Sequence, residues 1–253
     1  MISETLSRQI QDHALESYPL ESVGMVVDGK VTGRYIEGDY IRLENVHPQP
    51  THGFRVSGQD MLRMEGRITA IVHSHPDGGN APSASDMMSQ QMMNLPYIIV
   101  ATDGTNCLEP FAFGDCLEPL PLEGRVFRHA VTDCYELMRD YWMVNFGYRL
   151  QNIPRDWEWW RDGLDLYRDY FEPAGFRALR DGEQPQKHDC FFMSIGSKVP
   201  NHGGIYLGNG EILHHLGSTR HGPYSSSHLS VREFGGRYET LSPMFVRFKE
   251  PLP

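Results

Sequence analysis

The chain lacks the features that mark several protein classes. Its net charge is −10, so it has no excess of basic residues to neutralise phosphates, and we expect no nucleic-acid partner. No apolar run approaches the ~20 residues of a membrane helix, so we expect no membrane span. The four cysteines have no paired spacing, which excludes a disulfide framework and a Cys-x-x-Cys metal site. The polar N-terminus has no signal peptide, which favours synthesis in a cytoplasm and export by another route.

What is present is the composition of a globular protein with room for two small domains. Hydrophobic residues make up 40% of the 253 positions and charged residues 22%, which is enough apolar surface to bury a core. A stretch rich in proline and glycine predicts a boundary, at Pro110, Gly114, Pro119, Pro121 and Gly124. We therefore predict a first domain over 1–112, a linker over 113–121 and a second domain over 122–253.

The first predicted domain mixes helices and strands. The spacing of apolar residues predicts a helix over 3–17, which Pro19 ends, and a methionine-rich helix over 86–94. The dipeptide Asp28-Gly29 predicts a turn between two strands. Strands are expected at 23–27, 31–36, 40–43, 68–72 and 95–101. This pattern is typical of an α/β domain.

The second predicted domain places one helix before several strands. A helix is expected over 133–144, followed by an aromatic and charged stretch over 148–180. Glycines divide the remainder into short strands, at 191–195, 204–207, 211–213 and 244–248. A helix followed by antiparallel strands is an α+β arrangement. We interpret the tryptophans of the aromatic stretch as part of a core or lid rather than as a platform for sugars.

Two histidines and an aspartate in the first domain have the chemistry of a metal site. His73 and His75, two positions apart at a strand end, project to the same side. Asp86 adds a carboxylate from the start of the next helix. Three protein ligands leave a fourth position for water, as in catalytic zinc sites, where the metal lowers the pKa of that water. The alternative is a helix-capping box, which Ser83 and Asp86 also match.

The full spacing, His73-x-His75, seven residues and then Ser83-x-x-Asp86, resembles the motif of JAMM-type metalloproteases, which have the MPN fold. The resemblance implies that the two histidines and Asp86 bind Zn2+. It also implies that Glu21, which follows a helix and a proline, is the general acid and base, and that Ser83 stabilises the oxyanion. We therefore expect the first domain to be a JAMM/MPN-like zinc metalloprotease.

A cysteine and two histidines in the second domain indicate an activated thiol. Cys134 precedes a helix, whose N-terminus favours the thiolate, although free cysteines are also common as small buried residues. His202 and His214 flank a hairpin turn at Asn209-Gly210. A two-residue loop would put these histidines on opposite faces, whereas a three-residue loop pairs Gly204 with His214 and puts both on one face. We predict the second arrangement.

A set of residues around this thiol has the spacing of a known family: Asp133-Cys134, Asp189, Asn201-His202-Gly-Gly and His214. The set resembles NlpC-type cell-wall peptidases, which have a papain-like fold. The resemblance implies that Cys134 is the nucleophile, His202 the base and His214 the residue that orients the base. His215 competes with His214 for the third role.

The second domain also departs from the NlpC pattern. Tyr135 and Glu136 replace the small residues that usually follow the cysteine. The tyrosine that often donates a hydrogen bond on the substrate side has no counterpart before the cysteine, and neither Phe127 nor His129 simply takes its place. The aromatic stretch 148–180 is an insertion.

The order of the two domains, the total length and the segment Thr132-Asp133-Cys134-Tyr135 resemble the tail tip assembly protein K family of lambda-like phages. This resemblance implies a tail tip protein with peptidase activity. The thiol domain would cleave amide bonds of peptidoglycan stem peptides. The zinc domain would cleave an amide or isopeptide bond of a protein or peptide during tail assembly or DNA entry.

The same resemblance implies partners and a location. Other tail tip proteins and the peptidoglycan peptide are the expected partners, and the expected location is the host cytoplasm during assembly and then the virion tail tip. Two alternatives stay open. In one, both folds are structural parts of the tail tip; in the other, the zinc half processes another tail protein and only the thiol half cuts the wall.

Overall fold

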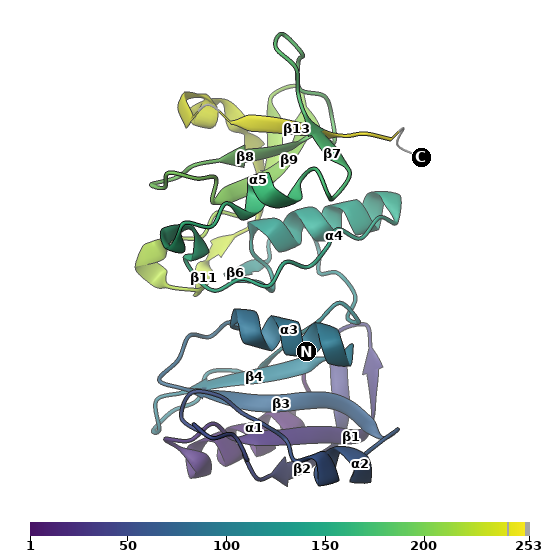
Figure 1. Cartoon of the computed structure of the whole chain (residues 1–253), viewed down its shortest axis with the longest axis vertical. Coiled ribbons are helices and arrows are strands. Elements are labelled where there is room, and N and C mark those ends of the chain that lie inside the picture. Colours follow the sequence, from purple (N-terminus) through teal and green to yellow (C-terminus); the bar gives the residue numbers. More distant parts are fainter. Residues whose placement is uncertain (242, 251–253) are drawn as a thin grey trace. The chain divides into compact units, whose positions relative to one another are not determined.

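The computed structural model describes residues 1–241 and 243–250 and divides the chain into two compact units, Met1–Glu118 and Pro119–Pro253 (Figure 1). Part of the segment expected to link two domains belongs to the first unit. Phe113 ends a strand of that unit, and Leu117 is buried in its core. In the part of the chain described, no helix combines the length and the apolar character that a membrane crossing requires.

The first unit contains one five-stranded sheet with helices packed on it. Its elements are α1 (Glu4–Ser17), β1 (Val23–Thr32), β2 (Tyr35–Leu43), α2 (Gly58–Arg63), β3 (Ile68–Pro76), α3 (Ala84–Met93), β4 (Tyr97–Thr102) and β5 (Phe111–Phe113). The strand order is β2-β1-β3-β4-β5. Only β3 and β4 are parallel, because α3 connects them as a crossover, and the other neighbours are antiparallel.

The helix α1 buries one apolar face against this sheet. Leu6, Ile10 and Ala14 recur at helical spacing and share a core with Val26 of β1 and Val72 of β3. Ser3 caps the helix, since its hydroxyl accepts a hydrogen bond from the amide of Leu6. The predicted helix is therefore confirmed, and the segment that follows it enters the sheet next to β3.

The predicted turn at Asp28-Gly29 is wrong, because β1 runs through these residues. The pairing of β1 with β2 shifts between Val27 and Lys30, which marks a β-bulge, and Asp28 has a φ of 52° there. The turn lies instead between Thr32 and Tyr35. A bulge and a turn both need the positive φ that Asp and Gly tolerate, so the dipeptide alone does not distinguish them.

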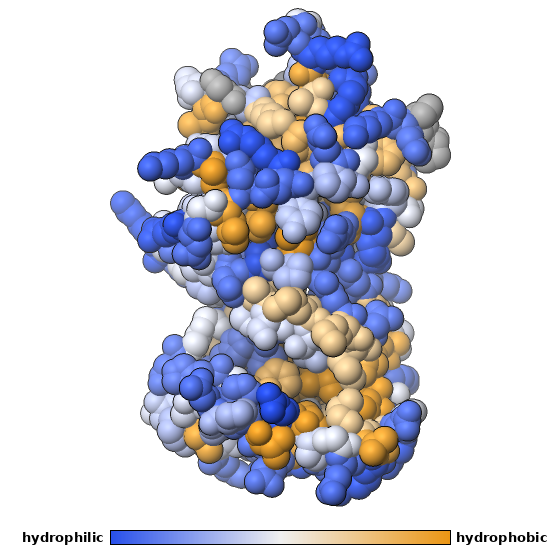
Figure 2. Space-filling model, viewed as in Figure 1, coloured by the Kyte–Doolittle hydropathy of each residue, from blue (hydrophilic) through white to orange (hydrophobic). Residues whose placement is uncertain are grey.

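The helix α3 carries a buried first turn and an exposed apolar side. Asp86 and Met87 are buried, whereas Met88, Met92 and Met93 are 50%, 87% and 36% exposed. Figure 2 shows apolar side chains gathered over this helix in the first unit. The capped end of α3 therefore points its first-turn carboxylate into the protein at the end of β3.

The second unit contains a six-stranded antiparallel sheet and a small two-stranded one. Its elements are β6 (Val126–Arg128), α4 (Cys134–Phe146), η1 (Trp159–Asp162), α5 (Leu166–Tyr170), β7 (Phe176–Ala178), β8 (Cys190–Met193), β9 (His202–Gly208), β10 (Glu211–His214), η2 (Thr219–His221), β11 (Tyr224–Leu229), β12 (Val231–Phe234), η3 (Gly235–Leu241) and β13 (Met244–Phe248). The large sheet has the order β12-β10-β9-β8-β13-β7, and β11 pairs with β6. The helix α4 packs against β9 (Figure 1).

The core of the second unit joins α4 to the sheet and to the aromatic insertion. Leu137 and Trp142 of α4 pack with Cys190 and Phe192 of β8, and Tyr167 of α5 belongs to the same core. Large aromatic side chains contribute much of the buried area here. The insertion is therefore part of the fold at Tyr167 rather than a free appendage.

The hairpin of β9 and β10 has the predicted pairing. Gly204 lies opposite His214, and the register shifts between Glu211 and Ile212. The predicted three-residue loop is wrong, because Glu211 pairs with Gly208 and the loop has two residues, Asn209 and Gly210. A bulge at Leu207 then gives the pairing that a plain two-residue loop would shift. His202 and His214 consequently lie on one face, as predicted.

Candidate active sites

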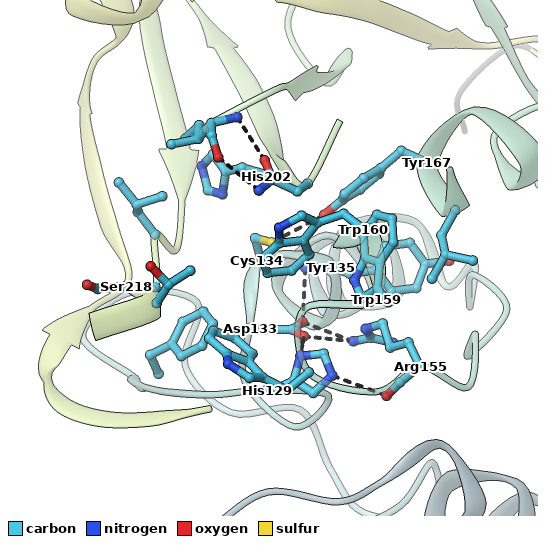
Figure 3. A pocket seen from close by; sticks show the side chains of 18 of the residues that line it. His129, Asp133, Cys134, Tyr135, Arg155, Trp159, Trp160, Tyr167, His202 and Ser218 are labelled. Atoms are coloured by element: carbon cyan, nitrogen blue, oxygen red, sulfur yellow. Dashed lines mark hydrogen bonds and ion pairs between the residues drawn. The ribbon is translucent and has the colours of Figure 1, made fainter. Parts of the chain in front are cut away.

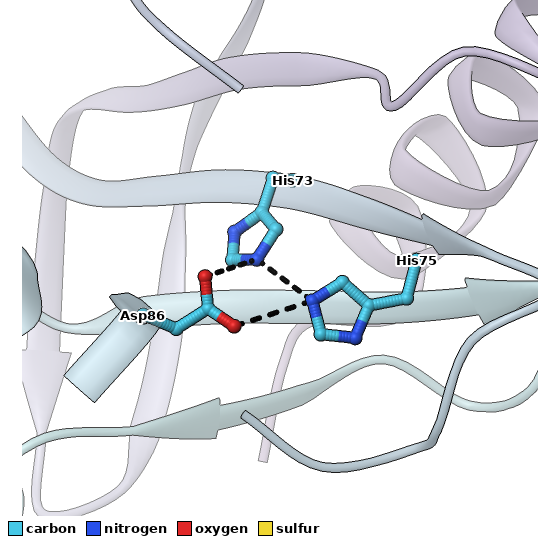
Figure 4. A group of neighbouring side chains, drawn as sticks. All are labelled: His73, His75 and Asp86. Atoms are coloured by element: carbon cyan, nitrogen blue, oxygen red, sulfur yellow. Dashed lines mark hydrogen bonds and ion pairs between the residues drawn. The ribbon is translucent and has the colours of Figure 1, made fainter. Parts of the chain in front are cut away.

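The first site lies where β3 ends and α3 begins. His73 and His75 point their Nε2 atoms toward each other at 3.1 Å, and both face the Asp86 carboxylate (Figure 4). The Asp86 oxygens lie 3.2 Å from His73 Nε2 and 3.3 Å from His75 Nε2. Tetrahedral zinc with bonds of about 2.0–2.1 Å holds its donor atoms about 3.3 Å apart. The three side chains therefore fit a zinc ion and leave a position for water.

Neighbouring groups hold both imidazoles in this orientation. His75 Nδ1 lies 3.1 Å from the Gly79 carbonyl oxygen, to which it donates when Nε2 carries the lone pair for a metal. The ring of Phe54 stacks on His73 at 4.3 Å between centroids, and His73 is fully buried. Among the described residues, His73 Nδ1 has no hydrogen-bond partner. Stacking rather than a hydrogen bond therefore fixes the plane of this ring.

Ser83 and Asp86 form the capping box that the sequence left as an alternative. The Ser83 hydroxyl accepts from the Asp86 amide at 3.1 Å, and Asp86 Oδ2 accepts from the Ser83 amide at 2.8 Å. The Ser83 hydroxyl also lies 2.7 Å from Asp86 Oδ2. The same carboxylate faces both imidazoles, so the capping box and the metal geometry coexist.

Glu21 lies in the segment between α1 and β1, close enough to the site to sense its charges. Its amide donates to the Pro50 carbonyl at 2.7 Å, and its carbonyl accepts from the Asn45 side chain at 2.9 Å. Burial raises the pKa of Glu21 to about 7; the charge of His75 opposes this shift and the charge of Asp86 adds to it. A carboxyl that titrates near neutral pH suits general acid–base chemistry.

The second site is a cavity of about 380 Å³ that contains Cys134 and His202 (Figure 3). Aromatic residues of the insertion form much of its wall, namely Trp157, Trp159, Trp160 and Tyr167. Polar groups reach it from Asn201, Ser218 and Thr219. A concave, largely aromatic cavity with a few polar groups is typical of a site for an organic ligand or a peptide.

Asp133 fixes the start of α4 and with it the position of Cys134. Its carboxylate accepts from the amides of Tyr135 at 3.1 Å, Glu136 at 2.9 Å and Ala130 at 2.8 Å. Arg155 donates to both of its oxygens, at 3.0 and 2.9 Å. The burial of Asp133 is therefore compensated by three backbone donors and one cation, and the cysteine is the first residue of a tightly capped helix.

The sulfur of Cys134 is a thiol rather than the thiolate that we expected from its helix position. Burial raises the pKa of Cys134 to about 11, and the negative charge of Asp133 adds to the shift. Hydrogen bonding to Tyr167 and to the Gly203 amide acts in the opposite direction. The Tyr167 hydroxyl lies 3.2 Å from the sulfur. Desolvation therefore outweighs the helix dipole in the resting site.

The two predicted histidines are in contact. His202 Nε2 lies 2.9 Å from His214 Nδ1, and burial lowers the pKa of both rings, so both are neutral at pH 7. His215, the competing candidate, is held elsewhere: Nδ1 bonds the Thr132 carbonyl and Nε2 lies 3.1 Å from the His228 carbonyl. His214, and not His215, therefore contacts His202.

Two residues at this site were not expected from the sequence. Tyr167 comes from the insertion, which carried only a general aromatic signal. Glu233 of β12 lies 2.6 Å from His214 Nε2. Its position would have followed from the strand register, had the short strand β12 been recognised. Neither residue belongs to a local motif with the cysteine.

Both units match described families. Residues 3–112 match the prokaryotic homologs of the JAB domain, and residues 110–234 match the NlpC/P60 family. The predicted order, an α/β JAMM/MPN-like domain followed by an α+β NlpC-type domain, is thereby confirmed. The second match includes the cysteine, both histidines and the whole insertion.

Similar proteins span one or both units. The chain is 32% identical over 106 residues to a probable TtuB-protein conjugate cleaving protease of Thermus thermophilus, which covers 39% of this chain and 68% of that protein. It is 39% identical over 164 residues to tail tip assembly protein K of Escherichia phage lambda, covering 64% of this chain and 77% of that protein. The protein of the same name from Escherichia phage N15 is 31% identical over 246 residues, covering 95% and 93%. With both domains matched in order and nearly its whole length aligned, the chain belongs to the tail tip assembly protein K family.

Proposed function

We propose that this chain is a phage tail tip protein with two hydrolytic sites. The thiol unit cleaves amide bonds of peptidoglycan stem peptides, and the first unit is a zinc peptidase for an amide or isopeptide bond of a protein or peptide. Two observations support the proposal: His73, His75 and Asp86 lie close enough together to hold one metal ion, and Cys134 lines the same cavity as His202, which contacts His214. A purely structural role would not need either set.

In the first unit, His73, His75 and Asp86 would hold the zinc ion. Zinc bound there supplies a Lewis acid and a water of lowered pKa. Glu21 takes up a proton and delivers it to the leaving amine, a task that suits a carboxyl with a pKa of about 7. The hydroxyl of Ser83 lies within 2.7 Å of a ligand oxygen, which places a donor at the edge of the site.

In the second unit, Cys134 attacks the carbonyl carbon of the substrate amide. His202 accepts the thiol proton and later gives it to the leaving amine, so that the C–N bond breaks and a thioester forms. Water then hydrolyses the thioester with His202 as the base. His214 orients His202, and the Tyr167 hydroxyl shares a hydrogen bond with the sulfur. A neutral thiol that lines the same cavity as a neutral imidazole is suited to this proton transfer during attack.

The substrate class of the zinc unit receives support from a relative. The Thermus protein is named as a protease that cleaves a protein conjugate, which favours a protein substrate joined by an isopeptide or amide bond. Other tail tip proteins are the natural candidates during assembly. If all tail proteins are processed normally in a phage carrying Glu21→Gln, the proposed role of the zinc unit in assembly is refuted.

The decisive experiment is mass spectrometry of purified peptidoglycan digested by the intact protein. Cys134→Ala removes the nucleophile, and Cys116→Ala is the matched control because Cys116 is an exposed cysteine in the first unit. A third sample is treated with a chelator. Peptide-bond cleavage that survives in the control and with chelator, but not in Cys134→Ala, is expected. Absence of cleavage in every sample would favour a structural role in the tail tip.

The metal is tested separately. Purified protein should contain about one zinc per chain, and Asp86→Ala should lose it, because the aspartate supplies one of three ligands. Elemental analysis measures this directly. A metal-free protein of normal stability would favour the structural role for the first unit.

A further inference from the structure

Three side chains form a diagonal line across neighbouring strands of the large sheet. His214 of β10 pairs with Gly204 of β9 and with Val231 of β12. His202 lies two residues before Gly204, and Glu233 lies two residues after Val231. Residues two apart in a strand point to the same face, so both are diagonal neighbours of His214 on one face. The register alone therefore brings Glu233 to the histidine pair.

The hydrogen bonds along this line have a defined direction. Glu233 Oε1 lies 2.6 Å from His214 Nε2, and His214 Nδ1 lies 2.9 Å from His202 Nε2. An ionised carboxylate only accepts, so His214 carries its proton on Nε2. In a neutral ring, Nδ1 then holds the lone pair and accepts the Nε2 proton of His202. The lone pair of His202 is therefore left on Nδ1, which becomes the nitrogen able to take a proton.

The surroundings keep Glu233 ionised. Arg237 of η3 donates to the same oxygen at 2.6 Å, and the Tyr238 hydroxyl lies 3.2 Å away. Burial alone would raise the pKa of Glu233, but the hydrogen bond from His214 and the charge of Arg237 hold it below its usual value. The titratable groups around His202 are His214, His215 and Asp133. Among these, only His214 contacts the ring through a hydrogen bond in the direction described.

We propose that Glu233 is a positioning residue of the thiol site, which sets the proton positions of His214 and His202 so that His202 Nδ1 serves as the base for Cys134. This inference rests on the proposed peptidase function of the second unit. Glu233 is not among the residues that line the cavity of Cys134, and it acts through the two histidines. Glu233 thus adds a fourth residue to the predicted set of Cys134, His202 and His214, and no sequence motif indicated it.

The test uses the full-length protein and compares Glu233→Gln with Glu211→Gln. Glu211 lies on β10, an odd number of residues from His214, so its side chain is on the opposite face. Nitrogen-15 NMR of the histidine rings at pH 7 should show Nε2–H on both His202 and His214 in the wild type and in Glu211→Gln. Glu233→Gln should populate the Nδ1–H form, and Glu233→Asp should restore the wild-type pattern at least in part.

Activity gives a second readout. In Glu233→Gln, kcat/KM for peptide cleavage should fall about 10- to 100-fold, the range for losing a charge-assisted bond to an orienting group. Nδ1–H on His214 in the wild type, or ring spectra unchanged in Glu233→Gln, would overturn the inference. The wild-type spectrum decides the matter even if the variant does not fold. If the protein cleaves no peptidoglycan but shows the expected ring protons, the proposed peptidase function is refuted, whereas the inferred proton positions of the two histidines are supported.

Discussion

Replacing Arg155 by methionine should destabilise the second unit far more than the same replacement at Arg161. Arg155 has a side-chain exposure of 3% and bonds Asp133 at 3.0 and 2.9 Å and Glu136 at 3.3 Å. Methionine keeps the apolar volume of the side chain but removes the cation. Asp133 would then be a buried carboxylate without its charge partner, although its three backbone donors remain.

The expected magnitude follows from this burial. Removing one partner of a buried ion pair costs about 3–5 kcal/mol, because the other charge is left uncompensated. Arg161 pairs with Glu158 at 2.8 Å, but its side chain is 65% exposed, so its loss should cost at most about 1 kcal/mol. A small domain has a total stability of about 5–15 kcal/mol, so only the first variant loses a large share of it.

Urea denaturation followed by tryptophan fluorescence measures the difference in one unit only. All four tryptophans, at positions 142, 157, 159 and 160, lie in the second unit, so the first unit contributes no tryptophan signal. With a slope near 2 kcal/mol per molar urea, the midpoint of Arg155→Met should fall by roughly 2 M, and that of Arg161→Met by less than about 0.5 M. Adding Asp133→Asn to Arg155→Met should recover part of the loss, because the amide keeps the helix cap without the charge.

Equal midpoints for the two arginine variants would refute this reasoning. A double variant less stable than Arg155→Met would also contradict it, because it would show that the negative charge of Asp133 is not the source of the cost.

Three further expectations concern the metal site, the thiol and acid stability. Phe54→Ala should weaken zinc binding about 10-fold in a competition titration, because the stacked ring holds His73, whereas Phe54→Tyr keeps the ring and should bind like the wild type. The rate at which iodoacetamide alkylates Cys134 should rise about tenfold per pH unit between pH 8 and 10, because the pKa of this thiol is about 11. Peptide mass spectrometry measures the rate, with exposed Cys116 as the reference. A plateau of the rate near pH 8.5 would contradict the burial argument. Burial would raise the pKa of Asp133, but the charge of Arg155 keeps this pKa far below its value in the unfolded chain. The ionised carboxylate therefore stabilises the fold above about pH 4, and this stabilisation is lost as the pH falls further. The fluorescence midpoint of the wild type should therefore drop more steeply below pH 4 than that of Arg155→Met, and parallel curves would argue against this role of the pair.

The parts of the fold that the sequence predicted are those with strong local patterns. The helix from Glu4 to Ser17 has an apolar stripe and a cap, and the strand from Met244 to Phe248 has a run of large apolar residues. The pairing of Gly204 with His214 could be predicted because, of the two loop lengths compared, only one puts both candidate histidines on one face, although the structure reaches this pairing through a bulge. The spacing of apolar residues and the chemistry of the candidate site together therefore predicted a strand pairing that neither predicts alone.

The rest depended on contacts that are distant in the sequence. The strand β7 has three residues, and β12 has four with polar and apolar residues mixed, so pairing with neighbours stabilises them rather than any local preference. Tyr167 reaches the cysteine across 33 positions, and its hydroxyl is placed by core packing. The protonated state of Cys134 could not be predicted because the helix position was visible in the sequence but the depth of burial was not.

The bulge beside the turn at Asn209-Gly210 makes the length of this hairpin a functional property. At the same length, a hairpin without this bulge would pair His214 with Ile205 instead of Gly204, turning its imidazole away from His202. A one-residue deletion in β9 that keeps the bulge would pair His214 with Gly203 and turn the imidazole in the same way, so we expect it to impair the thiol site more than most substitutions in these strands. Among related proteins, we expect this hairpin to vary by substitution, and insertions and deletions to occur only in loops outside it.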